Sequence, residues 1–208
     1  VQADVSAGLP LFAIVGLADT AVQEARDRVR AALRATGFQF PNARVIVNLA
    51  PAPLRKHGTG FDLPIALAIL AATGQVPASV FEGIAAVGEL GLDGSVREVP
   101  GVLAHALGAA AEERDLLGPG AALGVVCAVP GLRFRPLESL GRLSSGLPQP
   151  TTCEGLPPTS AHAAHLDLAV IAGQQVAKRC LQIAAAGNHN LLMIGPPGSG
   201  KTMLAQAL

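Results

Sequence analysis

The sequence predicts an α/β protein built from two modules. Segments with strand patterns alternate with segments with helix patterns through residues 1–143, as expected where helices pack on one sheet. A stretch rich in proline, serine and threonine follows at residues 144–165 and is typical of a linker. Residues 166–208 end in a short apolar run, a glycine-rich loop and a helix-forming segment. We therefore expect one α/β domain, a linker and the beginning of a second α/β module.

The first part of the chain predicts three strands and one amphipathic helix. A capping box, with Thr20 as the N-cap and Gln23 three residues later, predicts a helix that starts there and ends near Gly37. Its apolar stripe is predicted to contain Val22, Ala25, Val29, Ala32 and Leu33. The strand patterns lie at residues 1–5, 11–15 and 43–49.

Helices and strands continue to alternate in the rest of the chain. Residues 63–73 form a helix that is apolar nearly all round, which predicts that it is buried. A hairpin is expected from strands at residues 84–90 and 96–99, joined by a turn at residues 92–95. Helices are also expected at residues 101–113, 174–186 and 202–208, and strands at residues 122–129 and 190–194.

Composition excludes several classes of protein. Half of the 208 residues are apolar and 14% are charged, so a sizeable core can form. The 15 basic and 15 acidic residues leave no net charge that would favour nucleic acid, and Trp and Tyr are absent, which argues against a base-stacking platform. Every apolar run is broken before the roughly 18 residues of a membrane span. Cys127, Cys153 and Cys180 match no metal-site spacing. We expect a cytoplasmic protein.

A phosphate-binding loop is the strongest functional signal. Residues 195–202 match the P-loop pattern G-x-x-x-x-G-K-[ST], and they follow an apolar run and precede a helix, as this motif requires. Lys201 is expected to contact the terminal phosphates of ATP and to stabilise charge during phosphoryl transfer, and Thr202 to bind Mg²⁺. The predicted nucleotide-binding residues are Gly195, Pro196, Pro197, Gly198, Ser199, Gly200, Lys201 and Thr202.

Two further polar groups allow two interpretations each. Arg26, Arg30 and Arg34 share one helix face at a spacing of four residues; this row is either a solvated face, which we favour, or a contact for DNA phosphate or a neighbouring subunit. Glu24 lies four residues before Arg28 and predicts an ion pair. A second set, Lys56, His57 and Asp62, is either a polar site or, as we favour, a structural or interface element.

Several short motifs together resemble the Mg-chelatase-like AAA+ ATPases of the ComM/YifB type. They lie at residues 16–22, 48–51, 61–64, 87–90, 173–174, 178–179 and 191–205. The resemblance implies a Lon-protease-like (ribosomal protein S5 domain 2-like) domain over residues 1–143, followed after the linker by the start of an AAA+ module. It also implies a hexameric motor that uses ATP and Mg²⁺ to unwind or branch-migrate DNA. Ile171, Gly173 and Gln174 are nucleotide-pocket residues by resemblance.

The implied kinship to Lon peptidases predicts a domain without peptidase activity. In that comparison Gly60 occupies the position of the nucleophilic Ser, and Leu103 occupies the position of the catalytic Lys. With neither nucleophile nor base, covalent catalysis has no starting point.

Three functions remain open at this stage. The leading one is a piece of a DNA-remodelling ATPase. A metal-insertion motor of the magnesium-chelatase type shares the later motifs, although residues 1–140 argue against it. The third is a non-catalytic assembly or binding module, and it suits the 208-residue chain taken alone. Because the chain begins at Val1 and stops six residues after Thr202, we expect it to be an internal piece of a longer protein, with hydrolysis residues elsewhere.

Overall fold

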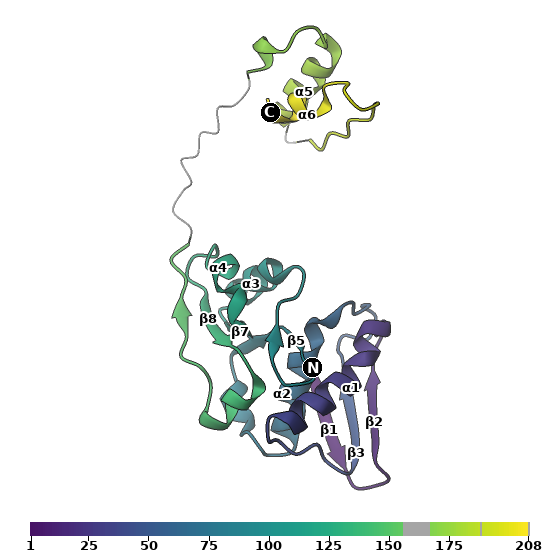
Figure 1. Cartoon of the computed structure of the whole chain (residues 1–208), viewed down its shortest axis with the longest axis vertical. Coiled ribbons are helices and arrows are strands. Elements are labelled where there is room, and N and C mark those ends of the chain that lie inside the picture. The colour runs from purple at the N-terminus through teal and green to yellow at the C-terminus, as the bar shows by residue number, and fades with distance from the viewer. Residues whose placement is uncertain (156–166, 188, 208) are drawn as a thin grey trace. The chain divides into compact units, whose positions relative to one another are not determined.

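The computed structural model describes residues 1–155, 167–187 and 189–207 of the chain. It divides into two compact units, Val1–Pro157 and Pro158–Leu208. Figure 1 shows the first unit in purple to green and the second in green to yellow. The predicted linker lies partly in the undescribed residues.

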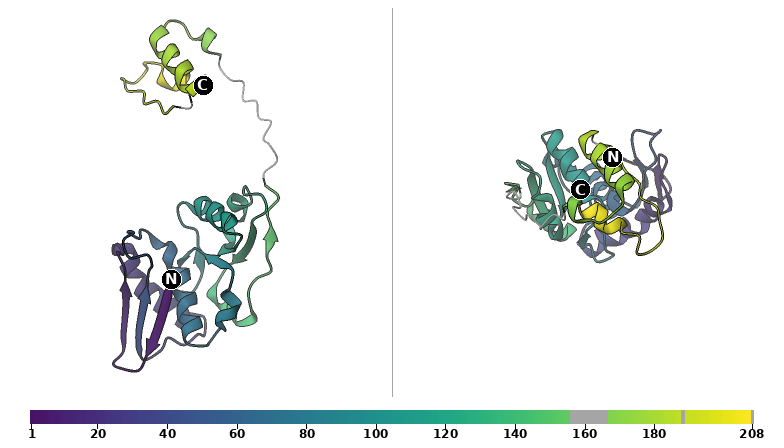
Figure 2. Two further views of the ribbon diagram at one scale, coloured as in Figure 1. Left: turned by 180° about the vertical axis from the view of Figure 1, so that it is seen from behind. Right: turned by 90° about the horizontal axis from the view of Figure 1, so that it is seen from above.

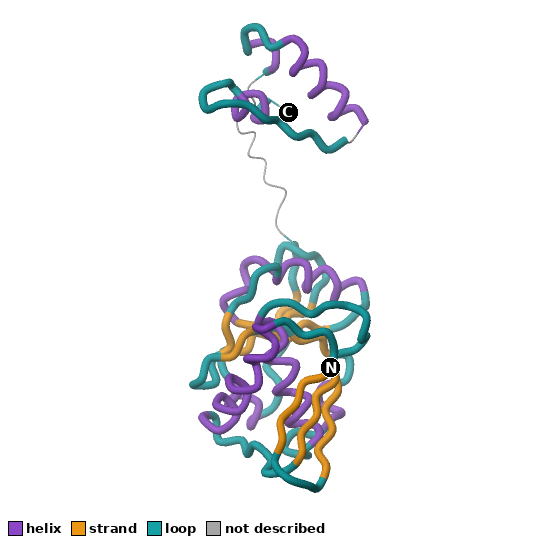
Figure 3. Tube along the Cα trace, turned by 90° about the vertical axis from the view of Figure 1, so that its right-hand side faces the viewer, coloured by secondary structure: helices purple, strands orange, loops and turns teal. Residues whose placement is uncertain are grey.

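A three-stranded sheet begins the first unit. Its strands are β1 (Gln2–Ser6), β2 (Leu11–Val15) and β3 (Arg44–Asn48), in the order β1-β3-β2. The central strand β3 runs antiparallel to β1 and parallel to β2. Figure 3 shows the three strands side by side in orange. Val45 and Val47 alternate with less buried neighbours, so one face of β3 meets the core, and the three strand predictions are confirmed.

Helix α1 (Thr20–Ala35) connects β2 to β3. All five residues of the predicted apolar stripe are buried. The predicted N-cap is wrong by one residue: Asp19, not Thr20, caps the helix, because its Oδ1 accepts the Val22 N–H at 2.9 Å. An aspartate and a threonine are both good caps, so residue type alone did not distinguish the two positions.

Helix α2 (Asp62–Ala72) follows a short 3₁₀ turn at Thr59–Phe61 and is the most buried helix of the first unit. It packs against β1 and α1 and continues the core of the three-stranded sheet. Because α2 is covered on several sides, its apolar residues need no single stripe, as the sequence predicted. Its buried residues are Asp62, Leu63, Ile65, Ala66, Leu67, Ile69 and Leu70.

A second sheet of four strands completes the first unit. Its strands are β4 (Ile84–Ala86), β7 (Asp115–Pro119), β8 (Arg133–Leu137) and β9 (Thr151–Thr152), in that spatial order. The views in Figures 1 and 2 show this sheet and the three-stranded sheet at opposite sides of the unit. The expected hairpin is only partly correct: β5 (Glu89–Leu90) pairs with β6 (Val96–Arg97), whereas β4 pairs in parallel with β7.

The strand predicted at residues 122–129 is wrong. This segment forms a 3₁₀ turn and the short helix α4 (Leu123–Val126), after helix α3 (Val102–Ala111) and β7. Ala122, Val126 and Val129 are buried at a spacing of four and three residues, which is a helical repeat that a short apolar run does not separate from a strand. The strands β7 and β8 were missed, and the expected single sheet is instead three sheets.

The first unit extends beyond residue 143. Strand β9 pairs with β8, and Cys153 is buried in the core of the four-stranded sheet. The described part of the segment predicted as a linker, residues 144–155, therefore packs on the first unit.

The second unit consists of helices around a small core. Its elements are a 3₁₀ turn at Leu168–Val170, α5 (Gln175–Gly187) and α6 (Lys201–Gln206). Ile171, Leu181 and Leu204 form the core, which joins the three elements. The strand predicted at residues 190–194 is not formed. The described part of the second unit contains no other strand that could pair with these residues.

Across the described residues, no helix combines the length and the apolar character needed to cross a bilayer.

Candidate nucleotide-binding site

The glycine-rich loop of the second unit turns back on itself before α6. Gly198 and Gly200 have φ angles of 79° and 83°, a left-handed conformation that glycine adopts without strain. Among the described residues, the N–H groups of these two glycines have no hydrogen-bond partner. Unpaired backbone donors in such a turn are suited to an anion.

Lys201 closes the loop from the first position of α6. Its Nζ donates to the carbonyl oxygens of Gly195 at 2.8 Å and Pro196 at 2.7 Å, and to Ser199 Oγ at 3.2 Å. These three contacts hold the ammonium group inside the curve of the loop. All three acceptors are neutral, so a phosphate group would be a stronger partner for the lysine than any of them.

The segment before α5 lies beside the loop. Gln174 has a φ of 54°, and its Nε2 is 3.4 Å from the carbonyl oxygen of Ser199. Lys178 Nζ donates to the carbonyl oxygen of Ile171, which ties the start of α5 to the preceding turn. The tertiary structure thus brings Gln174 to the loop from 25 positions away in sequence.

The remaining predicted site residues occupy different environments. Gly173 is exposed, with a φ of 68°, next to Gln174. Ile171 is buried among Leu181 and Leu204 below the loop, so its side chain belongs to the core of the second unit. Thr202 is exposed at the second position of α6, and its hydroxyl has no hydrogen-bond partner in the described part of the chain.

The residues present fit a magnesium nucleotide. The unpaired N–H groups of Gly198 and Gly200 and the ammonium group of Lys201 are donors for phosphate oxygens, and the free hydroxyl of Thr202 is a ligand type that Mg²⁺ accepts. The donors come from a single eight-residue segment at residues 195–202.

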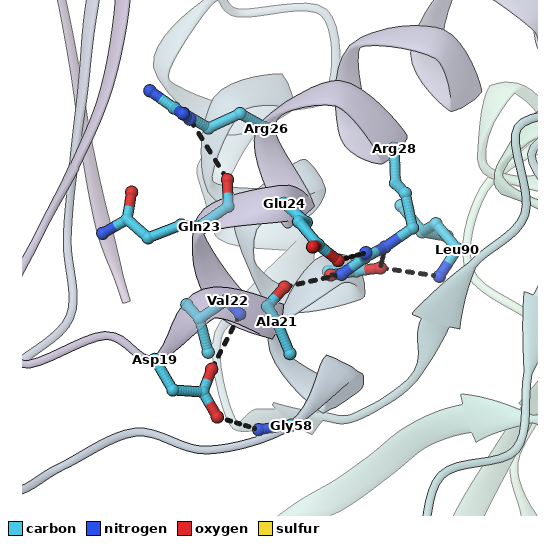
Figure 4. Close-up of polar contacts among 10 residues, drawn as sticks. Asp19, Ala21, Val22, Gln23, Glu24, Arg26, Arg28, Gly58 and Leu90 are labelled. Atoms are coloured by element: carbon cyan, nitrogen blue, oxygen red, sulfur yellow. Dashed lines mark hydrogen bonds and ion pairs between the residues drawn. The ribbon is translucent and has the colours of Figure 1, made fainter.

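In the first unit, Lys56, His57 and Asp62 do not form one polar site. Asp62 is fully buried, and its two carboxylate oxygens accept from Arg28, Oδ2 from Nε at 2.6 Å and Oδ1 from Nη2 at 3.0 Å. Oδ2 also accepts the Leu90 N–H at 3.2 Å (Figure 4). Asp62 therefore joins α1, α2 and β5 and has a structural role.

The other two members point to different partners. Lys56 is buried, and its Nζ donates to the carbonyl oxygen of Pro51. His57 Nδ1 lies 3.5 Å from Asp19 Oδ2. The same carboxylate oxygen accepts the Gly58 N–H at 3.1 Å, as Figure 4 shows. Asp19 thus connects the start of α1 to the segment before α2.

The predicted arginine row is not uniform. Arg26 and Arg34 are exposed, and Arg26 Nε donates to the carbonyl oxygen of Gln23 at 3.1 Å. The guanidinium group of Arg30 instead lies over the ring of Phe40, 4.7 Å from its centre, and its buried Nε has no hydrogen-bond partner within the described residues. Arg26 and Arg34 are therefore the exposed members of the row, whereas Arg30 is half-buried.

Sequence reasoning missed the role of Arg28. Its predicted contact with Glu24 exists at 3.6 Å, but the stronger partner is Asp62. An available signal was the aspartate at the start of an otherwise apolar, buried helix, because a buried carboxylate requires a charged or hydrogen-bonded partner.

A P-loop motif at the start of a helix, preceded in the sequence by a separate α/β unit, defines a P-loop protein of two modules. A family model described as "Subunit ChlI of Mg-chelatase" matches residues 1–121, and one described as "Magnesium chelatase, subunit ChlI" matches residues 167–208. The chain belongs to the magnesium-chelatase-like family that includes ComM and YifB.

Relatives along the whole chain support this assignment. The chain is 41% identical over 210 residues to "Uncharacterized protein YifB" of Escherichia coli and 42% identical over 215 residues to "Competence protein ComM" of Haemophilus influenzae. It is also 42% identical over 218 residues to "Uncharacterized protein Rv2897c" of Mycobacterium tuberculosis. Each match covers 100% of this chain but 42% of the relative.

Proposed function

We propose that this chain supplies the phosphate-binding part of an ATP-driven, DNA-remodelling motor. The observation that carries the proposal is the loop at residues 195–202, which contains both Lys201 Nζ, held against the carbonyl oxygens of the loop, and the unpaired N–H groups of Gly198 and Gly200. Because the chain corresponds to 42% of its relatives, hydrolysis and DNA remodelling are proposed for the full-length protein.

Each loop residue has a defined role in this proposal. Lys201 exchanges its three neutral partners for phosphate oxygens of ATP and stabilises the negative charge that increases during phosphoryl transfer. Thr202 provides its hydroxyl to Mg²⁺. Gln174 holds the Ser199 carbonyl and so positions the loop, with Gly173 beside it and Ile171 supporting the site from the core. Bound Mg²⁺ would neutralise phosphate charge.

The proposed action on DNA rests on family membership. The named relative in Haemophilus influenzae is a competence protein, and the motifs in this chain resemble DNA-remodelling AAA+ ATPases. In the proposal, the full-length protein assembles as a hexamer on single-stranded or branched DNA. The exposed Arg26 and Arg34 are candidate phosphate contacts on the first unit.

The test is ATP hydrolysis by the full-length protein with and without branched DNA. We expect DNA to stimulate hydrolysis and Lys201→Ala to abolish it, because the charge developing on the phosphates loses its main cation. Gln182→Ala, at an exposed position of α5 outside the motifs that carry the resemblance, is the control and should retain activity. Hydrolysis that survives Lys201→Ala would overturn the assignment of the loop.

Metal insertion is the second candidate. Both family descriptions carry the name of magnesium chelatase, including the one over residues 1–121, so the first unit does not by itself argue against it. DNA distinguishes the two functions: hydrolysis that depends on Lys201 but is unaffected by single-stranded and branched DNA would favour metal insertion. A non-catalytic assembly module would show neither nucleotide binding nor hydrolysis in the full-length protein.

A further inference from the structure

The first unit contains a groove of about 880 Å³ that neither the loop nor the proposed motor uses. This volume lies in the range of about 300–1,000 Å³ that is typical of ligand sites. The groove is lined by the segment at residues 55–61, by α2 and by β4, and His105 of α3 also lines it. The apolar lining includes Phe61, Leu67, Ala68, Phe81, Ile84 and Val87.

The strand along this groove has a short open edge. Within the described residues, β4 is an edge strand that pairs with β7. Its outer edge is open from Ile84 to Ala86 and is closed at Gly88, whose N–H donates to the carbonyl oxygen of Gly60 and whose carbonyl oxygen accepts the Leu63 N–H. The Asp115 N–H donates to Gly83 O and the Val87 N–H donates to Leu117 O, so Ala85 directs both of its backbone groups to β7. The backbone N–H and C=O groups of Ile84 and Ala86 consequently point to the edge of β4 that faces away from β7. These groups have no hydrogen-bond partner among the described residues. An unpaired strand edge is a template for an added strand.

The titratable side chains that line the groove are all basic. Arg55 is exposed and has no hydrogen-bond or ion-pair partner in the described part of the chain, and His105 is also exposed. Lys56 is already bonded to Pro51, and His57 Nδ1 lies 3.5 Å from Asp19 Oδ2, which is outside the groove. Arg55 is therefore the cation that remains for a ligand.

We propose that this groove binds an extended segment of a partner protein that carries apolar side chains and an acidic residue. The peptide adds a strand to the open edge of β4 and bonds to the backbone of Ile84 and Ala86. Its apolar side chains enter the lining formed by α2 and Phe81, and its carboxylate pairs with Arg55. The first unit is then a docking module, independent of nucleotide.

The first experiment measures fluorescence anisotropy of labelled peptides with the 208-residue chain. The probe is Ser-Leu-Ser-Leu-Ser-Leu-Asp, whose leucines lie on one face of an extended strand. Two further peptides are N-methylated at either the leucine or the serine amides. Because alternate amides point to opposite edges of a strand, one methylated peptide should lose binding at least tenfold while the other retains it. Equal binding of both would overturn pairing with β4.

Two variants locate the site. Ala68→Trp fills the groove from α2 and should weaken binding at least tenfold, whereas Ala72→Trp, on the exposed end of the same helix, should not. Arg55→Glu changes only an exposed side chain, so folding is retained. This variant should weaken binding of the peptide that ends in aspartate about fivefold and strengthen binding of a peptide that ends in lysine.

Unchanged binding in both groove variants would place the peptide elsewhere and overturn the proposal. Concentration-dependent self-association that Ala68→Trp abolishes, without peptide binding, would instead identify a second copy of the chain as the occupant and would also overturn it.

Discussion

Arg28 and Asp62 lie 34 positions apart in sequence and form a two-pronged ion pair in the first unit, with distances of 2.6 Å and 3.0 Å. The same Asp62 carboxylate accepts the Leu90 N–H, so one buried group connects α1, α2 and β5. Burial raises the pKa of Asp62 against the opposing effect of Arg28, and the hydrogen bond to Asp62 raises the pKa of Arg28. The pair is an organising contact of the first unit.

Asp62→Ala should destabilise the first unit by about 3–5 kcal/mol, because it leaves the Arg28 guanidinium largely buried without its main partner. Far-UV circular dichroism during urea unfolding is the suitable measurement, since the chain contains no Trp or Tyr for fluorescence. Glu24→Ala is the control: its side chain is 65% exposed, and the change should stay within about 0.5 kcal/mol. A cost for Asp62→Ala as small as that of the control would contradict this account.

Asp19→Ala should cost about 1 kcal/mol, because the first turn of α1 loses its N-cap. The hydrogen bond from the Val22 N–H, followed by those from Gly58 and His57, lowers the pKa of Asp19 below its usual 3.8. A carboxylate whose pKa is lower in the folded state stabilises the fold at pH values above its unfolded-state pKa. This stabilisation is lost as the pH falls through the folded-state pKa.

The difference in unfolding free energy between wild type and Asp19→Ala should therefore shrink as the pH falls below 3.8. Thr20→Ala, at the position that the sequence predicted as the cap, is the matched control and should have a small effect. A pH-independent difference would show that the carboxylate charge is not involved.

The three cysteines should differ sharply in reactivity toward iodoacetamide at pH 8. Burial, followed by the contact with Cys127, raises the pKa of Cys153 to about 12, so roughly a thousandfold less thiolate is present than at the ordinary 9.0. Cys180 is exposed and should react first. Mass spectrometry of proteolytic peptides measures the order, and Cys180→Ser should remove the fast phase. Labelling of Cys153 as fast as Cys180 would contradict the burial.

The isolated 208-residue chain should bind magnesium ATP at least tenfold more weakly than the full-length protein. Residues 190–194 lead into the loop without a strand partner among the described residues, and the side chains of Leu192 and Ile194 are 82% and 88% exposed. A parallel strand is stable only when paired and covered, so the loop lacks a rigid support. Calorimetry with wild type and Lys201→Ala tests this. Tight, Mg²⁺-dependent binding that Lys201→Ala removes would contradict it.

The first unit should not cleave protein substrates. Gly60 carries no side chain, and Leu103 is an apolar residue on α3 that is 40% exposed, so neither supplies a nucleophile or a base. Unfolded casein should remain intact on electrophoresis after prolonged incubation with the chain. Cleavage that disappears in Thr59→Ala would identify a nucleophile that this account lacks.

Residue spacing alone determined the local elements and the loop. The apolar stripe of α1 and the all-round burial of α2 follow from side chains three and four positions apart, which local periodicity describes well. The P-loop motif could be recognised in the sequence because phosphate binding of this kind needs fixed residue types within eight adjacent positions, 195–202; the binding of nucleotide by this loop stays a prediction. The short helix α4 was mistaken for a strand because four to eight apolar residues do not distinguish the two.

Only the tertiary structure decided the contacts between distant segments. The pairing of β4 with β7 rather than in a hairpin, the contact of Cys127 with Cys153 at 2.7 Å and the ion pair of Arg28 with Asp62 each join residues more than 20 positions apart. Such pairs form because buried polar groups and strand edges need hydrogen-bond partners. Which distant segments can supply those partners depends on the packing of the whole core and not on local residue spacing. The exposed segment before the P-loop illustrates the same dependence. Its apolar pattern is typical of a strand, but a strand forms only when another strand lies beside it.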